Sequence, residues 1–191
     1  MSPIGHPLYQ EPWPDGEYRF FQLGFLVDDE VPVAAERWAR VFGVGPFHVL
    51  PTFDQHATYR GAPATITCQV GVAQAGPVQI ELIHQYCDRP SVYREWSRGG
   101  TCAFHQLATV TPDYDGKKAH YEALGYEIAA ESDAGRFRTA FVDTSADFGF
   151  YTEVVESTPG FLHNLAMLAR AAVTWDGTDP VRILGPDGRA P

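Results

Sequence analysis

The chain has 191 residues and a mass of 21.1 kDa, which fits one domain or two small modules that share a core. Its composition, 45% hydrophobic and 13% aromatic, excludes a disordered or collagen-like chain, and its net charge of −10 would repel nucleic acid and an anionic membrane surface. Three cysteines without C-x-x-C spacing indicate reduced thiols, and no signal peptide or membrane span is recognisable. We therefore expect a cytoplasmic protein without a nucleic-acid or membrane partner.

A βαβββ unit is predicted over residues 18–87, after a Pro-rich arm at residues 1–17. Residues 18–27 are rich in aromatic and branched side chains, which is typical of a buried strand. A helix follows, with apolar residues at helical spacing from Val31 and a stop at Gly43. Three more strands are expected at residues 46–50, 64–73 and 78–85.

The same order of elements recurs over residues 102–157, after a linker at residues 88–101. A strand at residues 102–110 precedes a helix that ends at Gly125. Three strands are then expected at residues 126–130, 137–143 and 148–155. The helix-ending glycines, Gly43 and Gly125, have equivalent places in the two units, which indicates an internal repeat. Residues 158–191 are expected to form a last helix and a tail.

Polar residues occupy one face of four predicted strands. In VQIELIHQ, the alternation that turns Ile80 and Leu82 toward the helix turns Glu81 to the opposite face. The alternation in the other three strands places Gln22, His105 and Glu153 on the same face as Glu81. Any one of them alone is typical of a hydrogen-bonded core residue. Because burying unpaired carboxylates is costly, the four together favour a site that holds a cation, a proton or solvent.

The segments FQLGFLVDD, VQIELIHQ, AFHQLATVTPD and FGFYTEVVE resemble those of the vicinal oxygen chelate superfamily, which includes glyoxalase I, methylmalonyl-CoA epimerase and the extradiol dioxygenases. The resemblance covers roughly residues 18–157. It implies an α+β fold in which two paired βαβββ modules form a cup-shaped mixed sheet, here followed by a C-terminal helix. It also implies metal ligands on the first and fourth strands of each module, at Gln22, Glu81, His105 and Glu153.

This ligand set resembles the glyoxalase I type of eukaryotes and implies one divalent ion, Zn, Ni, Co, Mn or Mg, that acts as a Lewis acid. By the same resemblance, Glu153 is the base that moves a proton, with Glu81 as the alternative. The implied function is a metal-dependent isomerase, epimerase or lyase acting on a small or medium apolar carbonyl compound. Phe20, Tyr59 and Tyr151 are candidate substrate contacts.

Two other functions stay open within the same resemblance. The first is a non-catalytic protein that sequesters a small molecule in the cup without a metal. The second, an extradiol-type dioxygenase, is less favoured because it needs two histidines and one carboxylate, and only His105 is in register. The modules can pair within the chain or exchange across a homodimer.

Overall fold

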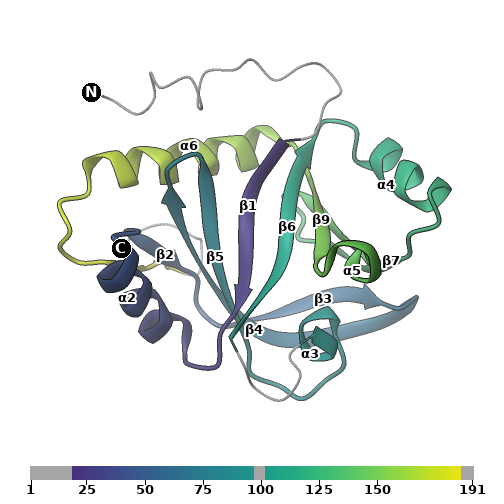
Figure 1. Cartoon of the computed structure of the whole chain (residues 1–191), viewed down its shortest axis with the longest axis horizontal. Helices are drawn as coiled ribbons and strands as arrows, with labels where there is room; N and C mark the ends of the chain where they lie inside the picture. The colour runs from purple at the N-terminus through teal and green to yellow at the C-terminus, as the bar shows by residue number, and fades with distance from the viewer. Residues whose placement is uncertain (1–18, 97–101, 186–191) are drawn as a thin grey trace.

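The structure, a computed structural model, describes residues 19–96 and 102–185. Figure 1 shows one strongly curved sheet with helices at its sides, so the predicted α+β class is confirmed. The predicted arm at residues 1–17, part of the linker and the end of the tail lie outside the described residues. Within the described residues, no helix has the length and apolar character needed to cross a bilayer.

The first module contains one strand more than predicted. Its elements are β1 (Arg19–Leu26), α2 (Val31–Phe42), β2 (Phe47–Val49), β3 (Phe53–Tyr59), β4 (Ala62–Ala75), β5 (Val78–Gln85) and the short helix α3 (Val92–Trp96). As predicted, α2 ends at Gly43, whose φ of 65° is the left-handed conformation that favours glycine. The unpredicted strand is β3, in which no residue is fully buried.

The second module has the four strands predicted for it, one fewer than the first module, and a short helix before the last of them. Its elements, with the C-terminal region, are β6 (Ala103–Thr111), α4 (Tyr114–Ala123), β7 (Ile128–Asp133), β8 (Arg138–Val142), α5 (Ser145–Phe148), β9 (Tyr151–Glu156), α6 (Pro159–Thr174) and β10 (Val181–Ile183). The predicted strand at 148–155 starts later than expected because α5 precedes it. The last helix begins as expected, since the Thr158 side chain accepts a hydrogen bond from the Phe161 backbone N–H at 3.2 Å.

The sheet closes on itself. Its strand order is β10-β2-β4-β3-β7-β8-β9-β6-β1-β5, and an additional pairing between β4 and β5 joins eight of these strands into a ring. The two modules meet at two antiparallel junctions, β1 with β6 and β3 with β7. The modules therefore pair within one chain, and the cup predicted from the resemblance is confirmed.

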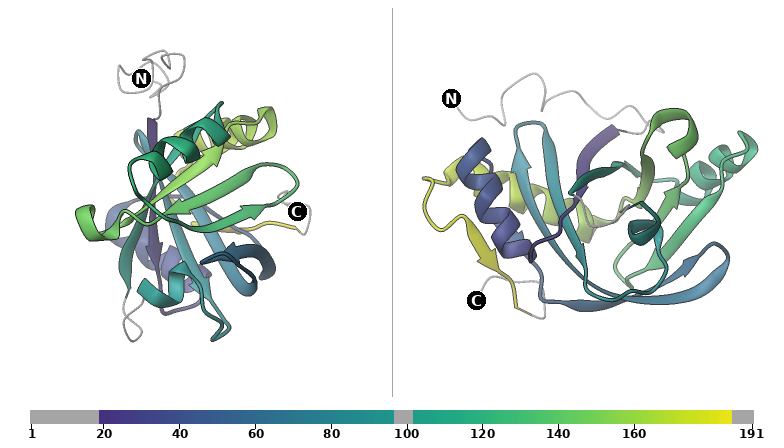
Figure 2. Two further views of the ribbon diagram at one scale, coloured as in Figure 1. Left: turned by 90° about the vertical axis from the view of Figure 1, so that its right-hand side faces the viewer. Right: turned by 60° about the horizontal axis from the view of Figure 1, so that its bottom comes forward.

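The helices cover different parts of this ring. The buried residues Val31 and Ala35 of α2 pack against Leu82 of β5, and α4 packs on β8 and β9. Helices α3 and α6 lie at opposite ends of the curved sheet (Figures 1 and 2). No residue of α6 is fully buried, and the helix is attached through Phe161 and Leu165. The face of the sheet that α2 and α4 do not cover thus carries α3 at one end, α6 at the other, and polar residues between them.

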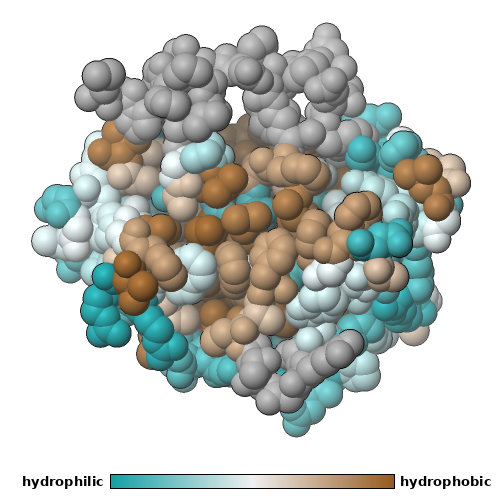
Figure 3. Space-filling model, viewed as in Figure 1, coloured by the Kyte–Doolittle hydropathy of each residue, from teal (hydrophilic) through white to brown (hydrophobic). Residues whose placement is uncertain are grey.

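A row of aromatic rings crosses the β1–β6 junction on the side of α2. The six rings, with neighbouring centroids 4.9–6.2 Å apart, are Phe42, Trp38, Phe25, Phe104, Phe150 and Phe148. Figure 3 shows apolar side chains gathered over this side of the molecule. Edge-to-face and tilted ring contacts of this kind stabilise the junction beyond the burial of apolar area.

Gly71 lets α2 lie close to β4, and its replacement is expected to be costly. A Cβ at this position would lie 2.7 Å from Val31 Cγ1 and 3.1 Å from Val49 Cγ2, two side chains with no exposed surface. Gly71→Ala should lower the free energy of unfolding by about 1–3 kcal/mol, measured by urea denaturation. Gly160→Ala is the control, because its Cβ would come no closer than 4.0 Å to Thr158 Oγ1. Equal stability of both variants would contradict the close packing.

Candidate active site

A group of polar side chains lies on the face of the sheet that points away from α2 and α4. Gln22 on β1 and Gln79 on β5 are paired in the strand register, and the Nε2 atom of the former lies 3.5 Å from Oε1 of the latter. Glu81 on β5, Gln106 on β6 and Glu153 on β9 complete the group. Gln106 has no exposed surface and Glu153 is only 8% exposed, whereas Glu81 is half-buried. The site is therefore polar but mostly shielded from water.

The two carboxylates occupy equivalent positions in the two modules. On β1, Gly24 pairs with Glu81 of β5, and on β6, Ala108 pairs with Glu153 of β9. Both pairings are parallel and join the first strand of a module to its last, so Ala108 is the counterpart of Gly24 and Glu153 that of Glu81. The internal repeat places one glutamate from each module in the same site.

The same register makes Gln106, and not the predicted His105, the counterpart of Gln22. Gln22 precedes Gly24 by two positions, as Gln106 precedes Ala108. His105 is not at the position equivalent to Gln22 because the pairing of β1 with β6 is irregular. Gly24 lies opposite Gln106, but the next residue of β1 lies opposite Phe104. His105 therefore has no partner on β1 in this register, and its side chain does not lie among the polar group.

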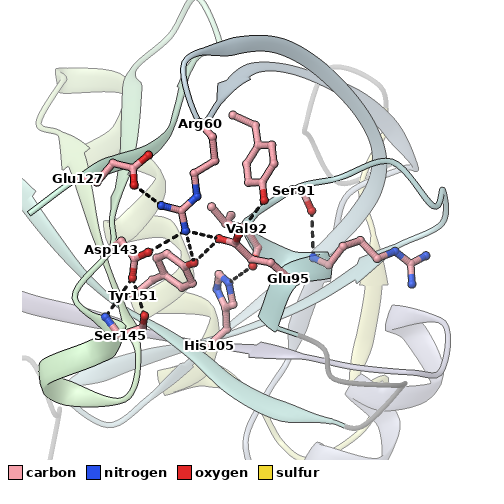
Figure 4. A network of polar contacts seen from close by, with 11 residues as sticks. Arg60, Ser91, Val92, Glu95, His105, Glu127, Asp143, Ser145 and Tyr151 are labelled. Atoms are coloured by element: carbon pink, nitrogen blue, oxygen red, sulfur yellow. Dashed lines mark hydrogen bonds and ion pairs between the residues drawn. The ribbon is translucent and has the colours of Figure 1, made fainter.

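His105 lies in an aromatic cluster beside α3. Its Nε2 atom is 3.1 Å from the Val92 carbonyl oxygen (Figure 4), and its ring is stacked on Tyr151 with centroids 5.1 Å apart. Three further rings surround it, from Tyr93, Trp96 and Phe141. Burial lowers the pKa of His105 to about 4, so the imidazole is neutral at pH 7. The Nδ1 atom contacts Oε1 of Gln106.

The Gln106 amide reaches Glu81 by passing over Gly24. Gln106 Nε2 lies 2.9 Å from Glu81 Oε2. A Cβ at Gly24 would lie 2.2 Å from Cδ of Gln106, so only glycine leaves room for this amide. Gln106 thereby contacts His105 on one side and the carboxylate group on the other.

The environment favours the protonated forms of the two carboxyl groups. Burial raises the pKa of Glu153 to about 7, against a smaller opposing effect of the Gln106 amide. Burial, and then the neighbouring Glu153 carboxylate, raise the pKa of Glu81 well above its usual range. Among the described residues, three buried side-chain atoms have no hydrogen-bond partner, and two of them, Gln79 Nε2 and Glu153 Oε2, belong to this site.

The residues do not fit the divalent ion that the resemblance implied. Residues 19–96 and 102–185 contain no cluster of three or more histidine, cysteine, aspartate or glutamate side chains suited to a metal ion. Both ring nitrogens of His105 face carbonyl oxygens, and an amide group of Gln106 occupies the position next to Glu81. Of the four predicted ligands, Glu81 and Glu153 come together, the Gln22 side chain contacts Gln79, and His105 contacts the Val92 carbonyl oxygen beside α3.

The purified protein is accordingly expected to carry far less than one divalent ion per chain. Elemental analysis after mild purification measures this directly, and addition of Mn²⁺ or Zn²⁺ should leave the melting temperature within about 1–2 °C, because a ligand stabilises only when it binds the folded state. One divalent ion per chain, or a melting temperature that falls by several degrees on treatment with a chelator, would show instead that the site binds a metal ion.

Of the three predicted substrate contacts, Tyr59 and Tyr151 meet at Glu95, and Phe20 is not part of this contact. Phe20 is 63% exposed at the start of β1. The hydroxyl groups of Tyr59 and Tyr151 both donate to Glu95 of α3, that of Tyr59 at 2.7 Å. The two tyrosines therefore hold α3 in place at the end of the site.

Arg60 is the centre of this network at α3 (Figure 4). Its guanidinium lies 3.0 Å from Glu95 and 2.7 Å from Asp143, and it also pairs with Glu127. Arg60 belongs to the turn between β3 and β4 and has a φ of 47°, so a residue of the first module binds carboxylates of the second. The sequence contains no local signal for this network, because its members are distant in the chain.

A small cavity adjoins α3, and a larger space lies elsewhere in the molecule. A cavity of about 20 Å³ next to Tyr93 is lined by residues such as Gln55, Ile66 and Phe141, and has room for about one water molecule. A larger space of about 430 Å³ lies between the end of α2, the β4–β5 hairpin and the end of α6, where Phe42, Val173 and Trp175 line it. The first lies in the core cluster that contains Tyr151 and Ile83.

Comparison with solved structures found chains that are similar to this one. A hypothetical protein from Bacillus halodurans C-125 superposes with a TM-score of 0.50 at 12% identity, covering 74% of this chain and 96% of that one. Methylmalonyl-CoA epimerase from Mycobacterium tuberculosis gives 0.49 at 19% identity, covering 81% and 97%. A variant of the Streptomyces coelicolor epimerase, in complex with 2-nitronate-propionyl-CoA, gives 0.48 at 17%, covering 73% and 97%.

No curated protein matches the sequence. The model of one protein family matches residues 21–141, a range that begins in β1 and ends in β8 and so takes in the first module and most of the second. The chain therefore belongs to the glyoxalase/bleomycin resistance protein/dioxygenase superfamily.

Proposed function

We propose that this protein is an enzyme that moves a proton at the carbon next to a carbonyl group, as an isomerase, epimerase or lyase. The observation that carries the proposal is the pair Glu81 and Glu153, one glutamate from each module, placed together in a shielded site. A carboxylate with a pKa of about 7, such as Glu153, suits a general base that works near neutral pH.

The two unpartnered atoms of the site complement such a substrate. Gln79 lies two residues before Glu81 on the same face of β5, and its Nε2 donor is buried without a partner. It is placed to donate to a carbonyl oxygen as negative charge develops there. The unpartnered Oε2 of Glu153 is placed to accept the proton from the neighbouring carbon. Only protein groups and a proton take part in these steps.

The substrate is proposed to be uncharged and largely apolar near its carbonyl group. The site already contains two carboxyl groups, so an anionic substrate would be repelled. On the same strands, the residues that follow the glutamates by two positions are Ile83 and Val155, both buried. These neighbours favour an apolar substituent over a carboxylate or a phosphate.

Exchange of hydrogen for deuterium tests the proposal directly. Uncharged ketones, aldehydes and esters are incubated with the protein in deuterated water, and NMR measures deuterium at the carbon next to the carbonyl group. Catalysed exchange of at least one compound, lost in the Glu81→Gln, Glu153→Gln double variant, is expected. Compounds that raise the melting temperature but never exchange would support a non-catalytic binding protein instead.

A further inference from the structure

A strip of apolar side chains along α6 stays partly open to solvent. It lies beside the face of the helix that packs on the sheet through Phe161 and Leu165. The two ends of the strip, Leu162 and Val173, are 45% and 40% exposed. Its members follow one another at intervals of three or four residues and so share one side of the helix: Leu162, Ala166, Ala169 and Val173.

The α6 strip connects the start of the described chain to the space of about 430 Å³. Phe161 of α6 contacts Phe21 edge to face, with ring centroids 5.7 Å apart, so the strip begins near the start of β1. Val173, at the other end, lines the space together with Trp175. Figure 1 shows this course, with α6 starting beside β1 and ending on the side of α2. An apolar path therefore leads from the point where residues 1–18 are attached to an apolar space.

The sequence of residues 1–18 is typical of a segment that binds an apolar surface. The segment contains four prolines, and Trp13 stands between Pro12 and Pro14. Proline favours an extended polyproline conformation in itself and in the residue before it. Such segments bind where aromatic side chains are exposed, because their backbone loses little entropy on binding. At the space, Phe42 is 64% exposed and so has area left to bury.

The length of the segment matches the length of the strip. Trp13 precedes Arg19, the first described residue, by six positions, which span about 19 Å in a polyproline conformation. Phe161 and Val173 are twelve positions apart, which span about 18 Å in a helix. Trp13 therefore reaches the space when the segment follows α6. Clefts of about 300–1,000 Å³ bind organic molecules larger than an indole, so the space can take this side chain.

The charges of the segment and of α6 are complementary. Residues 1–18 contain three acidic residues and no lysine or arginine. The sequence of α6 contains no aspartate or glutamate, and it contains one arginine, Arg170. Because the whole chain has a net charge of −10, much of its other surface repels an acidic segment. Helix α6 is therefore a surface on which this segment meets no repulsion from the helix itself.

We propose that residues 1–18 bind along the α6 strip of their own chain, with the Trp13 side chain in the space between α2, the β4–β5 hairpin and α6. The covalent link at Arg19 holds the segment near the strip at an effective concentration in the millimolar range. A second copy of the chain would first have to overcome the repulsion between two acidic proteins. This interaction is independent of the proposed function, since it involves none of the polar residues of the candidate site.

Fluorine-19 NMR of the full chain with fluorinated tryptophan tests the proposal. The chain has four tryptophans, and Trp13→Phe identifies the signal of Trp13. With its indole in the space, this signal should differ from that of the free amino acid and should not shift between H₂O and D₂O. Trp13→Ala should move the signal of Trp175, which lines the space, and should leave that of Trp96 at α3 unchanged.

Two glutamate substitutions on α6 form a matched pair. Val173→Glu places a carboxylate at the end of the strip, next to the space. Met167→Glu places the same charge at a position of similar exposure, 45% against 40%, that does not line the space. Val173→Glu should return the Trp13 signal to the position and the solvent shift of the free amino acid, whereas Met167→Glu should change neither. Melting temperatures show that both variants are folded.

Several results would overturn the proposal. These are a Trp13 signal of the unaltered protein that equals that of the free amino acid, a Trp175 signal that Trp13→Ala does not move, and equal effects of Val173→Glu and Met167→Glu. A Trp13 signal that changes on dilution would show that the segment binds a second copy instead. A small molecule found by mass spectrometry in the folded protein, with Trp13 exposed to solvent, would assign the space to that molecule. No substrate is needed, so a failure of the proposed function leaves these results unaffected.

Discussion

Glu153→Gln is expected to slow deuterium exchange by about 10²–10⁴-fold, the usual contribution of a positioned acid or base group. The substitution keeps the size and hydrogen-bonding capacity of the side chain but removes its ability to take a proton. Because Glu153 is 8% exposed and its Oε2 atom has no partner, water is poorly placed to act in its stead. Rates of exchange measured by NMR at saturating and limiting substrate separate the loss in turnover from any change in binding.

Glu81→Gln provides the matched comparison, since it alters the equivalent residue of the first module. A glutamine resembles a protonated glutamic acid, so this variant should retain considerably more activity than Glu153→Gln. Glu122→Gln, on the exposed side of α4, controls for the loss of a carboxylate in general. Full activity of Glu153→Gln together with an inactive Glu81→Gln would assign the base to the first module.

The titration of Glu153 is expected to lower the free energy of unfolding as the pH rises from about 5 to 8, and above pH 6.5 this decline is expected to be visible by itself. Glu153 has a pKa of about 7 in the folded protein against an ordinary value of 4.5, so in this range the folded state binds more protons than the unfolded state. Stability therefore falls with increasing pH. The difference in pKa corresponds to on the order of 3 kcal/mol between the two ends of the range, and Glu81 acts in the same direction. Urea denaturation at intervals of half a pH unit measures it.

At lower pH, the titration of His105 changes the free energy of unfolding in the opposite direction. Its pKa is lowered to about 4 in the folded protein from an ordinary value of 6.5, so the unfolded state binds more protons between these values and stability rises with pH there. The two effects oppose one another near pH 5–6, and the decline due to the carboxyl groups stands alone above pH 6.5. Glu153→Gln should flatten this decline, and a wild-type stability that increases from pH 6.5 to 8 would contradict the assignment.

The elements predicted from the sequence are those whose signal is local. Strands such as β5 carry a strong alternation of apolar residues, and α2 has a regular apolar spacing with Gly43 at its end, so both were predicted within a few residues of their positions. The strand β3 has the sequence FDQHATY and no fully buried residue. It is a strand because β4 and β7 pair with it, which no local pattern reveals.

In the candidate site, too, the residues with a local sequence signal are predicted, and those placed by contacts distant in the chain are not. Glu81 and Glu153 were predicted from strand parity, and the structure brings them together. His105 is predicted as the counterpart of Gln22 because the two residues are separated by nearly the same number of positions as Gly43 and Gly125. However, Gln-Leu-Gly at residues 22–24 recurs as Gln-Leu-Ala at residues 106–108. That tripeptide is the sequence signal for Gln106. The irregular pairing that turns His105 away depends on the β1–β6 contact and has no sequence signal of its own.

The two junctions that close the ring have a consequence for how the chain folds. Leu23 pairs with Leu107 and Tyr59 pairs with Ala130, so each junction joins strands from different modules, with most of a module between them in the chain. Contacts this distant in the chain form late and slowly, since the entropy of closing a long loop precedes any gain. Until they form, β1 and β3 present unpaired edges to other chains. The same pairings are then available between two copies, so exchange of modules is the characteristic assembly error of this architecture at high concentration.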